Sequence, residues 1–241
     1  MKTLLKIQDL EVAYKKGQQV IKGVDLTLNK GTVYGLVGKN GSGKTTLLKT
    51  LSSVFNQNIY SLDNFLFLGK TSNLNSEFYR RNKYTVFAES ESFLNWTFEK
   101  YIEMICKLYR LPIEEEKLFE LVKGFKFENY YQKEIRELST GNKKKVFLIT
   151  GLYLRRPLLI LDEPFDGLDF DATEYLYQRV ALYKKYGTVL MSTHFAESVV
   201  RVCDSLYILE NGNLNLFQGN LFKWLELIKS KGASDDLESN L

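Results

Sequence analysis

Residues 38–46 read GKNGSGKTT, and their types and spacing suit the binding of a polyphosphate. Two glycines separated by four residues and followed by Lys and Thr form the phosphate-loop pattern. Glycines let the backbone wrap closely around phosphates with its N–H groups pointing inward. Lys44 can then reach the β- and γ-phosphates, and the Thr45 hydroxyl can ligate Mg²⁺. The pattern predicts that the nucleotide-binding residues are Gly38, Asn40, Gly41, Ser42, Gly43, Lys44, Thr45 and Thr46.

A second chemical signal is the pair of carboxylates Asp162 and Glu163, which follows the apolar run at residues 158–161. Such a run is typical of a buried strand in a parallel sheet, and α/β sheets bind ligands at the carboxyl ends of their strands. Asp162 can hold Mg²⁺ through water, and Glu163 can polarise a water molecule that attacks a phosphate. The alternative is a solvated Asp-Glu loop, which fits less well in a chain that already carries a phosphate loop.

The elements on either side of the phosphate loop are those that it requires. Residues 32–37 predict a buried strand before the loop, and Leu47, Leu48 and Leu51 form one apolar face of a helix after it. An ordinary glycine-rich turn, which is the alternative interpretation, does not need this context. We expect Thr45 to open the helix, so that the positive end of the helix dipole faces the anion.

The rest of the chain alternates between strand and helix patterns, with one interruption. Strands are predicted at residues 3–14, 20–28, 84–88 and 188–192, and as a hairpin of residues 206–209 and 214–217. Residues 93–137 instead show helical spacing, and Pro112 followed by three glutamates predicts the start of a second helix there. This stretch is therefore interpreted as an inserted helical sub-domain, whereas residues 56–83 carry no motif.

The composition narrows the class of protein. The 33 basic and 29 acidic residues among 241 give a net charge of +4, too mild to indicate nucleic-acid binding. Apolar runs fall short of the roughly 20 residues that cross a bilayer, and the N-terminus becomes charged before a signal-peptide core can form. Cys106 and Cys203 are isolated and are expected to be buried, reduced thiols. A cytosolic location is predicted.

Together these residues resemble the ATP-binding subunit of ABC transporters, over nearly the whole chain. The family's signature motif resembles residues 138–142, its D-loop residues 167–169, and its switch histidine His194, which is the chain's one histidine. Tyr14, which can stack on an adenine ring or lie half-buried in a sheet, matches the family's adenine-stacking aromatic residue. Glu89 falls at the Q-loop position.

The resemblance implies a role for each matching residue. Lys44, Glu163 and His194 would be catalytic, and Tyr14 would join the phosphate loop in binding ATP. Ser139 and Gly141 would donate hydroxyl and N–H groups to the γ-phosphate of a nucleotide held by a second subunit. The residues implied for Mg²⁺ are Thr45, Glu89 and Asp162.

Two departures from the family pattern bear on the hydrolysis rate. The signature usually has glycine third and glutamine fifth, where this chain has Thr140 and Asn142. Thr140 adds bulk beside the phosphate. The Q-loop glutamine is replaced by Glu89, which adds a negative charge, and this change together with the short following loop is closer to exporter-type members.

We therefore expect an α/β fold: a P-loop NTPase core with a mixed sheet, an N-terminal antiparallel β sub-domain and an inserted α-helical sub-domain at about residues 90–140. Residues 1–230 are predicted to be a single ATPase domain, followed by a flexible tail at 231–241. The predicted function is an ATPase that dimerises around MgATP, with a second copy or a homologous subunit. It would power a separate transmembrane permease from the cytoplasmic face of the membrane. Two alternatives stay open, a non-transport ATPase of the same superfamily acting on nucleic acid or the ribosome, and a nucleotide-gated adaptor with little turnover.

Overall fold

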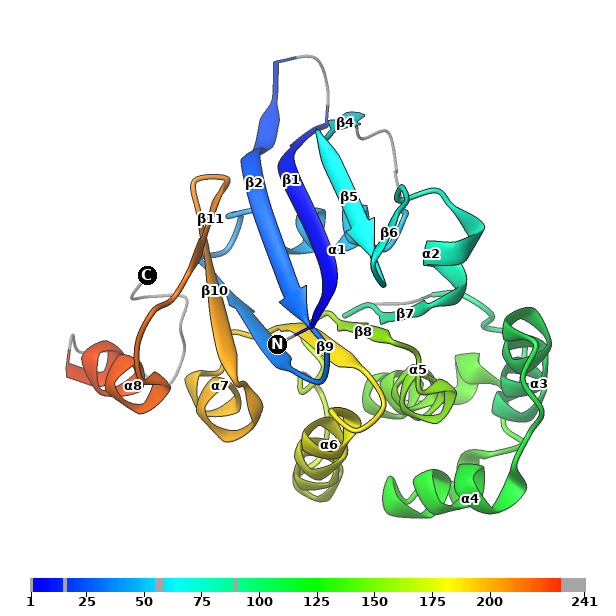
Figure 1. Cartoon of the computed structure of the whole chain (residues 1–241). Helices are drawn as coiled ribbons and strands as arrows, with labels where there is room; N and C mark the ends of the chain where they lie inside the picture. The colour runs from blue at the N-terminus through cyan, green and yellow to red at the C-terminus, as the bar shows by residue number, and fades with distance from the viewer. Residues whose placement is uncertain (1, 15–16, 55–58, 89–90, 231–241) are drawn as a thin grey trace.

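The computed structural model describes residues 2–14, 17–54, 59–88 and 91–230, and a six-stranded sheet lies at its centre (Figure 1). The strand order is β11-β10-β3-β9-β8-β7, with all pairs parallel except β10 and β11. These strands are β3 (Val33–Val37), β7 (Lys83–Val86), β8 (Leu158–Leu161), β9 (Thr188–Ser192), β10 (Ser205–Glu210) and β11 (Asn213–Leu216). Strands β3, β8 and β9 are buried along their whole length, as expected for strands covered on both faces.

A second, antiparallel sheet covers one side of the molecule, with strand order β2-β1-β5-β6 and β4 paired to β1. Its strands are β1 (Thr3–Ala13), β2 (Gln19–Asn29), β4 (Ile59–Ser61), β5 (Asn64–Phe67) and β6 (Lys70–Thr71). Strands β1 and β2 match the sequence prediction. The last three strands lie in the stretch where the sequence shows no motif.

Aromatic packing explains how this polar stretch becomes part of the fold. Phe65 and Phe67 of β5 are buried, and both rings meet the ring of Tyr79 edge-on, at 5.0 and 4.9 Å between centroids. Tyr79 belongs to the short helix α2 (Glu77–Arg81), which begins at the N-cap Ser76. Burial of aromatic surface thus stabilises short strands whose own pattern is too brief to be recognised.

The two sheets enclose one apolar layer, and helices cover the far face of the central sheet. Helix α1 (Lys44–Leu51) places its leucines in the layer between the sheets, with Leu158 and Ile160 of β8. Leu159 and Leu161 point to the opposite face, because side chains alternate along a strand. That face packs against α5 (Thr140–Leu154), α6 (Phe170–Tyr183) and α7 (Ala196–Val202). This arrangement confirms the predicted fold class.

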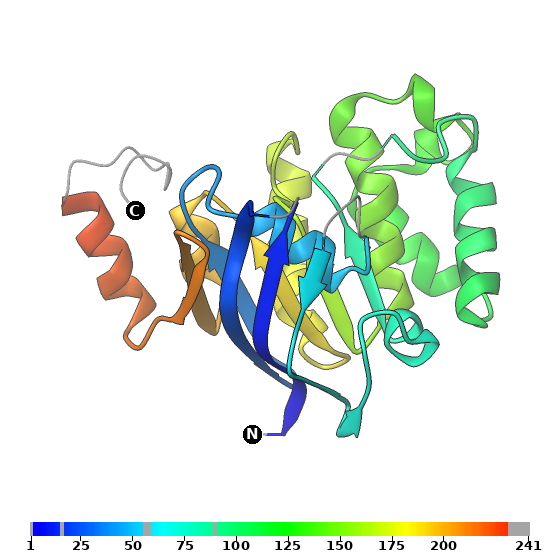
Figure 2. The ribbon, with the colours of Figure 1, turned by 90° about the horizontal axis from the view of Figure 1, so that it is seen from above.

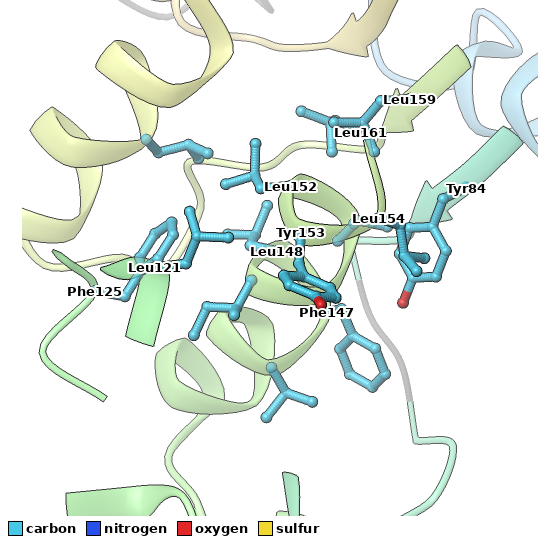
Figure 3. Packing of buried hydrophobic residues seen from close by; sticks show 14 of the residues in the cluster. Tyr84, Leu121, Phe125, Phe147, Leu148, Leu152, Tyr153, Leu154, Leu159 and Leu161 are labelled. Atoms are coloured by element: carbon cyan, nitrogen blue, oxygen red, sulfur yellow. The ribbon is translucent and has the colours of Figure 1, made fainter. Parts of the chain in front are cut away.

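The helical sub-domain lies at one end of the molecule and the C-terminal helix α8 (Leu221–Ser230) at the other, as Figure 2 shows. The main helices of the helical sub-domain are α3 (Phe98–Tyr109) and α4 (Glu115–Gly124). Figure 3 shows Leu148 and Leu152 of α5 between β8 and α4, so α5 joins the sub-domain to the central sheet. Among the described residues, no helix is long and apolar enough to cross a membrane.

The second helix of the sub-domain begins later than the sequence predicts. Helix α4 starts at Glu115, with Glu114 as its N-cap, and Pro112 lies before it. The Tyr153 hydroxyl donates to the Pro112 carbonyl at 3.2 Å and accepts the Glu114 N–H at 2.6 Å. These two bonds hold the segment in a non-helical turn against α5.

A buried lysine leads to a prediction about stability. The Lys83 ammonium donates to the Ser52 carbonyl at 2.7 Å and lies 5.3 Å from the centre of the Tyr79 ring. Burial, with help from the Arg80 charge, lowers the pKa of Lys83 to about 8. In the unfolded chain its pKa is 10.5, so the unfolded state binds more protons between these values. The wild-type free energy of unfolding, measured relative to Lys83→Met, should therefore rise with pH, by about 2 kcal/mol from pH 7.5 to 9.5.

Urea unfolding of the two proteins across this range gives the measurement. Lys185→Met, a change at an exposed lysine in the turn between α6 and β9, is the control. A constant difference between wild type and Lys83→Met would show that Lys83 does not titrate differently in the two states.

Candidate active site

The phosphate loop connects the end of β3 to α1, and its backbone is left open toward an anion. Gly43 has a left-handed backbone with φ of 107° and gives α1 no side-chain cap. The first N–H groups of a helix have no partner within the helix, and without a cap they can bind phosphate oxygens. The helix begins at Lys44, one residue earlier than predicted.

Close packing of the loop against β10 requires glycine at Gly38. A Cβ atom there would lie 2.3 Å from the carbonyl oxygen of Leu209 and 2.6 Å from the Ser42 Oγ. The first value is well inside any contact that real side chains make, so the loop can approach β10 only with glycine at this position.

Two buried side chains of the loop indicate what it binds. The Lys44 ammonium donates to the carbonyl oxygens of Gly38, at 2.5 Å, and Lys39, at 3.4 Å. The Ser42 hydroxyl is buried and has no hydrogen-bond partner among the described residues. An anion with several oxygens would accept from both groups, which is the chemistry of a phosphate.

A cavity of about 600 Å³ adjoins the loop. It lies between β2, the loop and the β10–β11 hairpin, and its lining includes Val20, Lys22, Asn40, Gly41 and Asn211. Tyr14 stands near the same loop, because its hydroxyl lies 2.6 Å from the Thr46 Oγ1. The Tyr14 side chain follows the end of β1 and is 44% exposed. This exposure favours a ring that is free to stack on a base, and it disfavours the alternative of a tyrosine half-buried in the sheet.

Asp162 lies at the end of β8 with 2% of its surface exposed. Its Oδ1 accepts a hydrogen bond from the Ser192 hydroxyl at 2.7 Å. Burial raises the pKa of Asp162, while the Ser192 hydrogen bond and the charges of Lys49 and Lys44 oppose that rise. The charge of Lys44 thus acts on the predicted carboxylate from the phosphate loop.

Glu163 is held in an unusual backbone conformation, with φ of 44°. Such conformations cost about 1–3 kcal/mol and persist only where the surroundings fix them. Here the Glu163 N–H donates to the Ser192 Oγ at 2.9 Å, and its carbonyl accepts from Lys144 at 2.8 Å. Its carboxylate lies 3.0 Å from the His194 Nδ1.

Burial raises the pKa of the Glu163 carboxyl, opposed chiefly by His194. The other ring nitrogen of His194, Nε2, lies 3.6 Å from Asp166. Asp162, Glu163 and His194, which the sequence singles out, thus lie together through the Ser192 hydrogen bonds and the Glu163–His194 contact, and the charge of Lys44 acts on both carboxylates. Ser192, Lys144 and Asp166 also take part, and sequence reasoning missed them because their contacts join residues that lie far apart in the sequence.

The signature residues lie in a different cavity. Ser139 caps α5, because its side chain accepts the Asn142 N–H at 3.3 Å. A Cβ at Gly141 would lie 2.3 Å from the Gly167 carbonyl, so the start of α5 packs tightly on the predicted D-loop. Ser139, Gly141 and Thr140 line a cavity of about 570 Å³, which shares no residue with the cavity beside the phosphate loop. Within one chain, the signature does not complete the phosphate site.

A glycine-rich loop between a core strand and a helix, with a buried aspartate at a nearby strand end, defines a P-loop nucleotide-binding protein. Comparison with known proteins makes the class more specific. The family model described as ABC transporter matches residues 21–166. The chain belongs to the ABC transporter family, and as an ATP-binding subunit of that family it is an ATPase.

Curated relatives agree over most of the chain. A putative ABC transporter ATP-binding protein of Bacillus subtilis, AlbC, is 38% identical over 87% of this chain and 89% of its own length. A second protein of that organism, the ABC-type transporter ATP-binding protein EcsA, is 33% identical over 98% of this chain and 95% of its own length.

Solved structures show the same fold. One, described as an ATP binding subunit of an ABC transporter, superposes with a TM-score of 0.80 at 28% identity and covers 96% of both chains. The ATP-binding cassette MJ0796, in a dimeric post-hydrolysis state bound to ADP and Pi, superposes with a TM-score of 0.77 over 90% of this chain and all of its own. Its identity is 20%, so that likeness supports the fold alone.

The close contact at Gly38 predicts the effect of one substitution. Gly38→Ala should displace the loop from Leu209, because the added methyl group overlaps the carbonyl oxygen. We expect a loss of about 1–3 kcal/mol in the free energy of unfolding and an ATP affinity at least ~10-fold weaker, since a tenfold change needs only about 1.4 kcal/mol.

The matched control is Gly69→Ala, where no atom lies within 4 Å of an added Cβ and only the positive φ opposes the change. Isothermal titration with ATP and thermal melting compare the two variants. Unchanged ATP affinity in Gly38→Ala would show that the loop tolerates a side chain at this position.

Proposed function

We propose that two copies of this chain, or this chain and a homologous subunit, close around two MgATP molecules and drive a separate transmembrane permease. One observation carries the proposal. The cavity beside the phosphate loop and the cavity beside Ser139 and Gly141 share no residue, and each is open. Two-fold pairing lets the signature cavity of each copy face the phosphate loop of the other, which completes two identical sites.

In each site the phosphate loop binds the nucleotide. Lys44 exchanges its carbonyl partners for phosphate oxygens, and Ser42 gains the acceptor that it otherwise lacks within the described residues. The free N–H groups at the start of α1 add donors to the phosphates. Tyr14 stacks on the adenine ring.

The residues near the loop also fit Mg²⁺, which prefers oxygen ligands and retains several waters. Thr45 offers a hydroxyl beside the loop, and Asp162 offers a buried carboxylate whose second oxygen makes no hydrogen bond within the described residues. When bound, Mg²⁺ would neutralise charge on the β- and γ-phosphates. Glu89, the third predicted metal residue, lies outside the described residues, as does the predicted tail at 231–241.

Glu163 and His194 are the residues that carry out hydrolysis. Glu163 orients the attacking water and takes its proton, and a raised pKa brings this base closer to the operating pH. His194 holds the Glu163 carboxylate through both its ring Nδ1 and its backbone N–H, at 3.0 and 3.2 Å. Because the base must be ionised, turnover rises as pH passes upward through the pKa of Glu163.

One observation favours the low-turnover adaptor as a second candidate. Thr140 is exposed and lines the signature cavity where family members usually have glycine. Its side chain occupies space that a γ-phosphate held by the partner would approach. Slow hydrolysis with intact nucleotide-dependent dimerisation is the behaviour expected of that alternative. Measuring phosphate release by the purified chain distinguishes the two candidates.

The permease is expected to dock beside the start of α3, from the membrane side, with this chain peripheral on the cytoplasmic face. Phe93 and Trp96 form an aromatic pair, with ring centroids 5.4 Å apart. They are 38% and 37% exposed, whereas Phe98 and Tyr101 are buried in the sub-domain. Exposed aromatic residues are frequent hot spots for a docking helix. The export direction that Glu89 suggests stays a prediction.

Replacing Glu163 by Gln tests the catalytic assignment. The amide keeps the size of the side chain but cannot take a proton, so turnover should fall ~10²-fold or more while MgATP binding persists. The trapped nucleotide should hold two copies together, which light scattering with MgATP measures. Glu197→Gln, on the surface of α7, is the control. A monomeric and still active Glu163→Gln chain would contradict the proposal.

Trp96→Ala and Phe93→Ala test the docking surface. Both should weaken recovery of the membrane subunit that co-purifies with the wild-type chain, because each removes exposed aromatic area from the docking surface. ATP hydrolysis by the isolated chain should not change. Phe119→Ala, an exposed phenylalanine on α4, is the matched control. Full recovery of the membrane subunit would exclude this surface, and a large drop in melting temperature would assign the two residues to the core.

A further inference from the structure

Lys144 is a buried cation that the proposed mechanism has not used. It lies in the second turn of α5, with 6% of its surface exposed. Its ammonium reaches across to the neighbouring strand end and donates to the Glu163 carbonyl at 2.8 Å. A charged group is rarely buried unless it is paired or hydrogen-bonded, so its placement there needs a reason.

The backbone of Glu163 gives that reason. A residue other than glycine with φ of 44° is not held there by its own preference, and the surroundings must hold it. Ser192 accepts from the N–H on one side, and Lys144 donates to the carbonyl on the other. The second bond is charge-assisted and therefore the stronger kind. Together the two bonds fix both peptide groups of Glu163, and so the direction of its carboxylate.

Helix α5 also holds the segment that follows Glu163. The tight contact between Gly141 and Gly167 lies at the start of the helix, and Lys145 pairs with Asp169 at 2.8 Å. Residues 163–169 are thus attached to the first two turns of α5 at both ends. These turns also carry Ser139, the residue proposed to meet the nucleotide of the second copy.

We infer that Lys144 is a positioning residue, which sets the Glu163 carboxylate and couples it to the position of the signature helix. A displacement of α5 when the partner's nucleotide arrives would move Glu163 through this bond. The inference rests on the proposed role of Glu163 in hydrolysis. The inference adds a link between the two sites of the proposed dimer. Glu163 in one site is positioned by α5 of the same chain, and the first turn of that helix faces the nucleotide of the other site.

The test compares Lys144→Met, which keeps the length of the side chain and loses its donor, with Lys144→Arg, which keeps a charged donor. We expect kcat to fall at least tenfold in Lys144→Met, with KM and the MgATP dissociation constant within twofold of wild type. Lys144→Arg should restore at least a third of kcat. Lys143→Met, the adjacent half-buried lysine on the same helix, should match wild type and serves as the control.

A second comparison separates positioning from mere structural support. In a Glu163→Gln background the Lys144→Met change should lower the residual kcat less than twofold, because no base remains to be positioned. A tenfold further loss there would overturn the inference, as would a wild-type kcat in Lys144→Met alone, or equal losses in Lys143→Met and Lys144→Met.

Two further outcomes are also decisive. If Lys144→Met melts below the assay temperature, Lys144→Leu, a shorter side chain that also lacks a donor, replaces it, and a kcat equal to wild type in that variant contradicts the inference. If Glu163→Gln itself retains full activity, the proposed function fails, whatever the Lys144 variants do. An inactive Glu163→Gln with a fully active Lys144→Met leaves the proposed function intact and removes this inference alone.

Discussion

The Ser192 hydroxyl makes the contact on which the geometry of the site depends. It donates to the Asp162 carboxylate and accepts from the Glu163 N–H, so one oxygen fixes two consecutive residues at the end of β8. Ser192 ends β9, which lies between β3 and β8 in the sheet. The strand that leads to the phosphate loop and the strand that ends in the carboxylates are therefore held in register by the strand between them. A displacement of β9 would alter the distance from Lys44 to Asp162.

Most of the remaining structure packs around the strands that lead to this site. The layer between the two sheets places the leucines of α1 against β8, and α5 covers the opposite face. Charged side chains in this region are hydrogen-bonded or paired, because burial disfavours an isolated ion. Lys144 and Lys145 both lie buried on α5, one bonded to the Glu163 carbonyl and the other to Asp169. The same burial raises the pKa values of Asp162 and Glu163, so the packing that stabilises the fold also adjusts the acid–base chemistry.

Sequence reasoning reached the parts of the fold whose patterns are local. The strand that leads to the phosphate loop and the strand before Asp162 each depend on a few adjacent residues, and the structure has them where they were predicted. Strands β4 to β6 were not predicted because each has only two to four residues, too few for a pattern to be recognised, and β5 packs through the contacts of Phe65 and Phe67 with Tyr79. The contacts of Lys144 and Ser192 escaped for another reason. They join residues 19 to 30 positions apart, and no periodicity signals such a meeting.

The order of strands in the central sheet has a consequence for how the protein is made. Strand β3 pairs with β9 and β10, which follow it by about 155 and about 170 residues. At usual rates of synthesis, of roughly 5–20 residues per second, β3 waits about 8–30 s for either partner. During that time its edges are unpaired and its apolar side chains can meet β1 and β2 but no neighbouring strand. The nucleotide-binding loop is thus among the first segments to leave the ribosome and among the last to be completed.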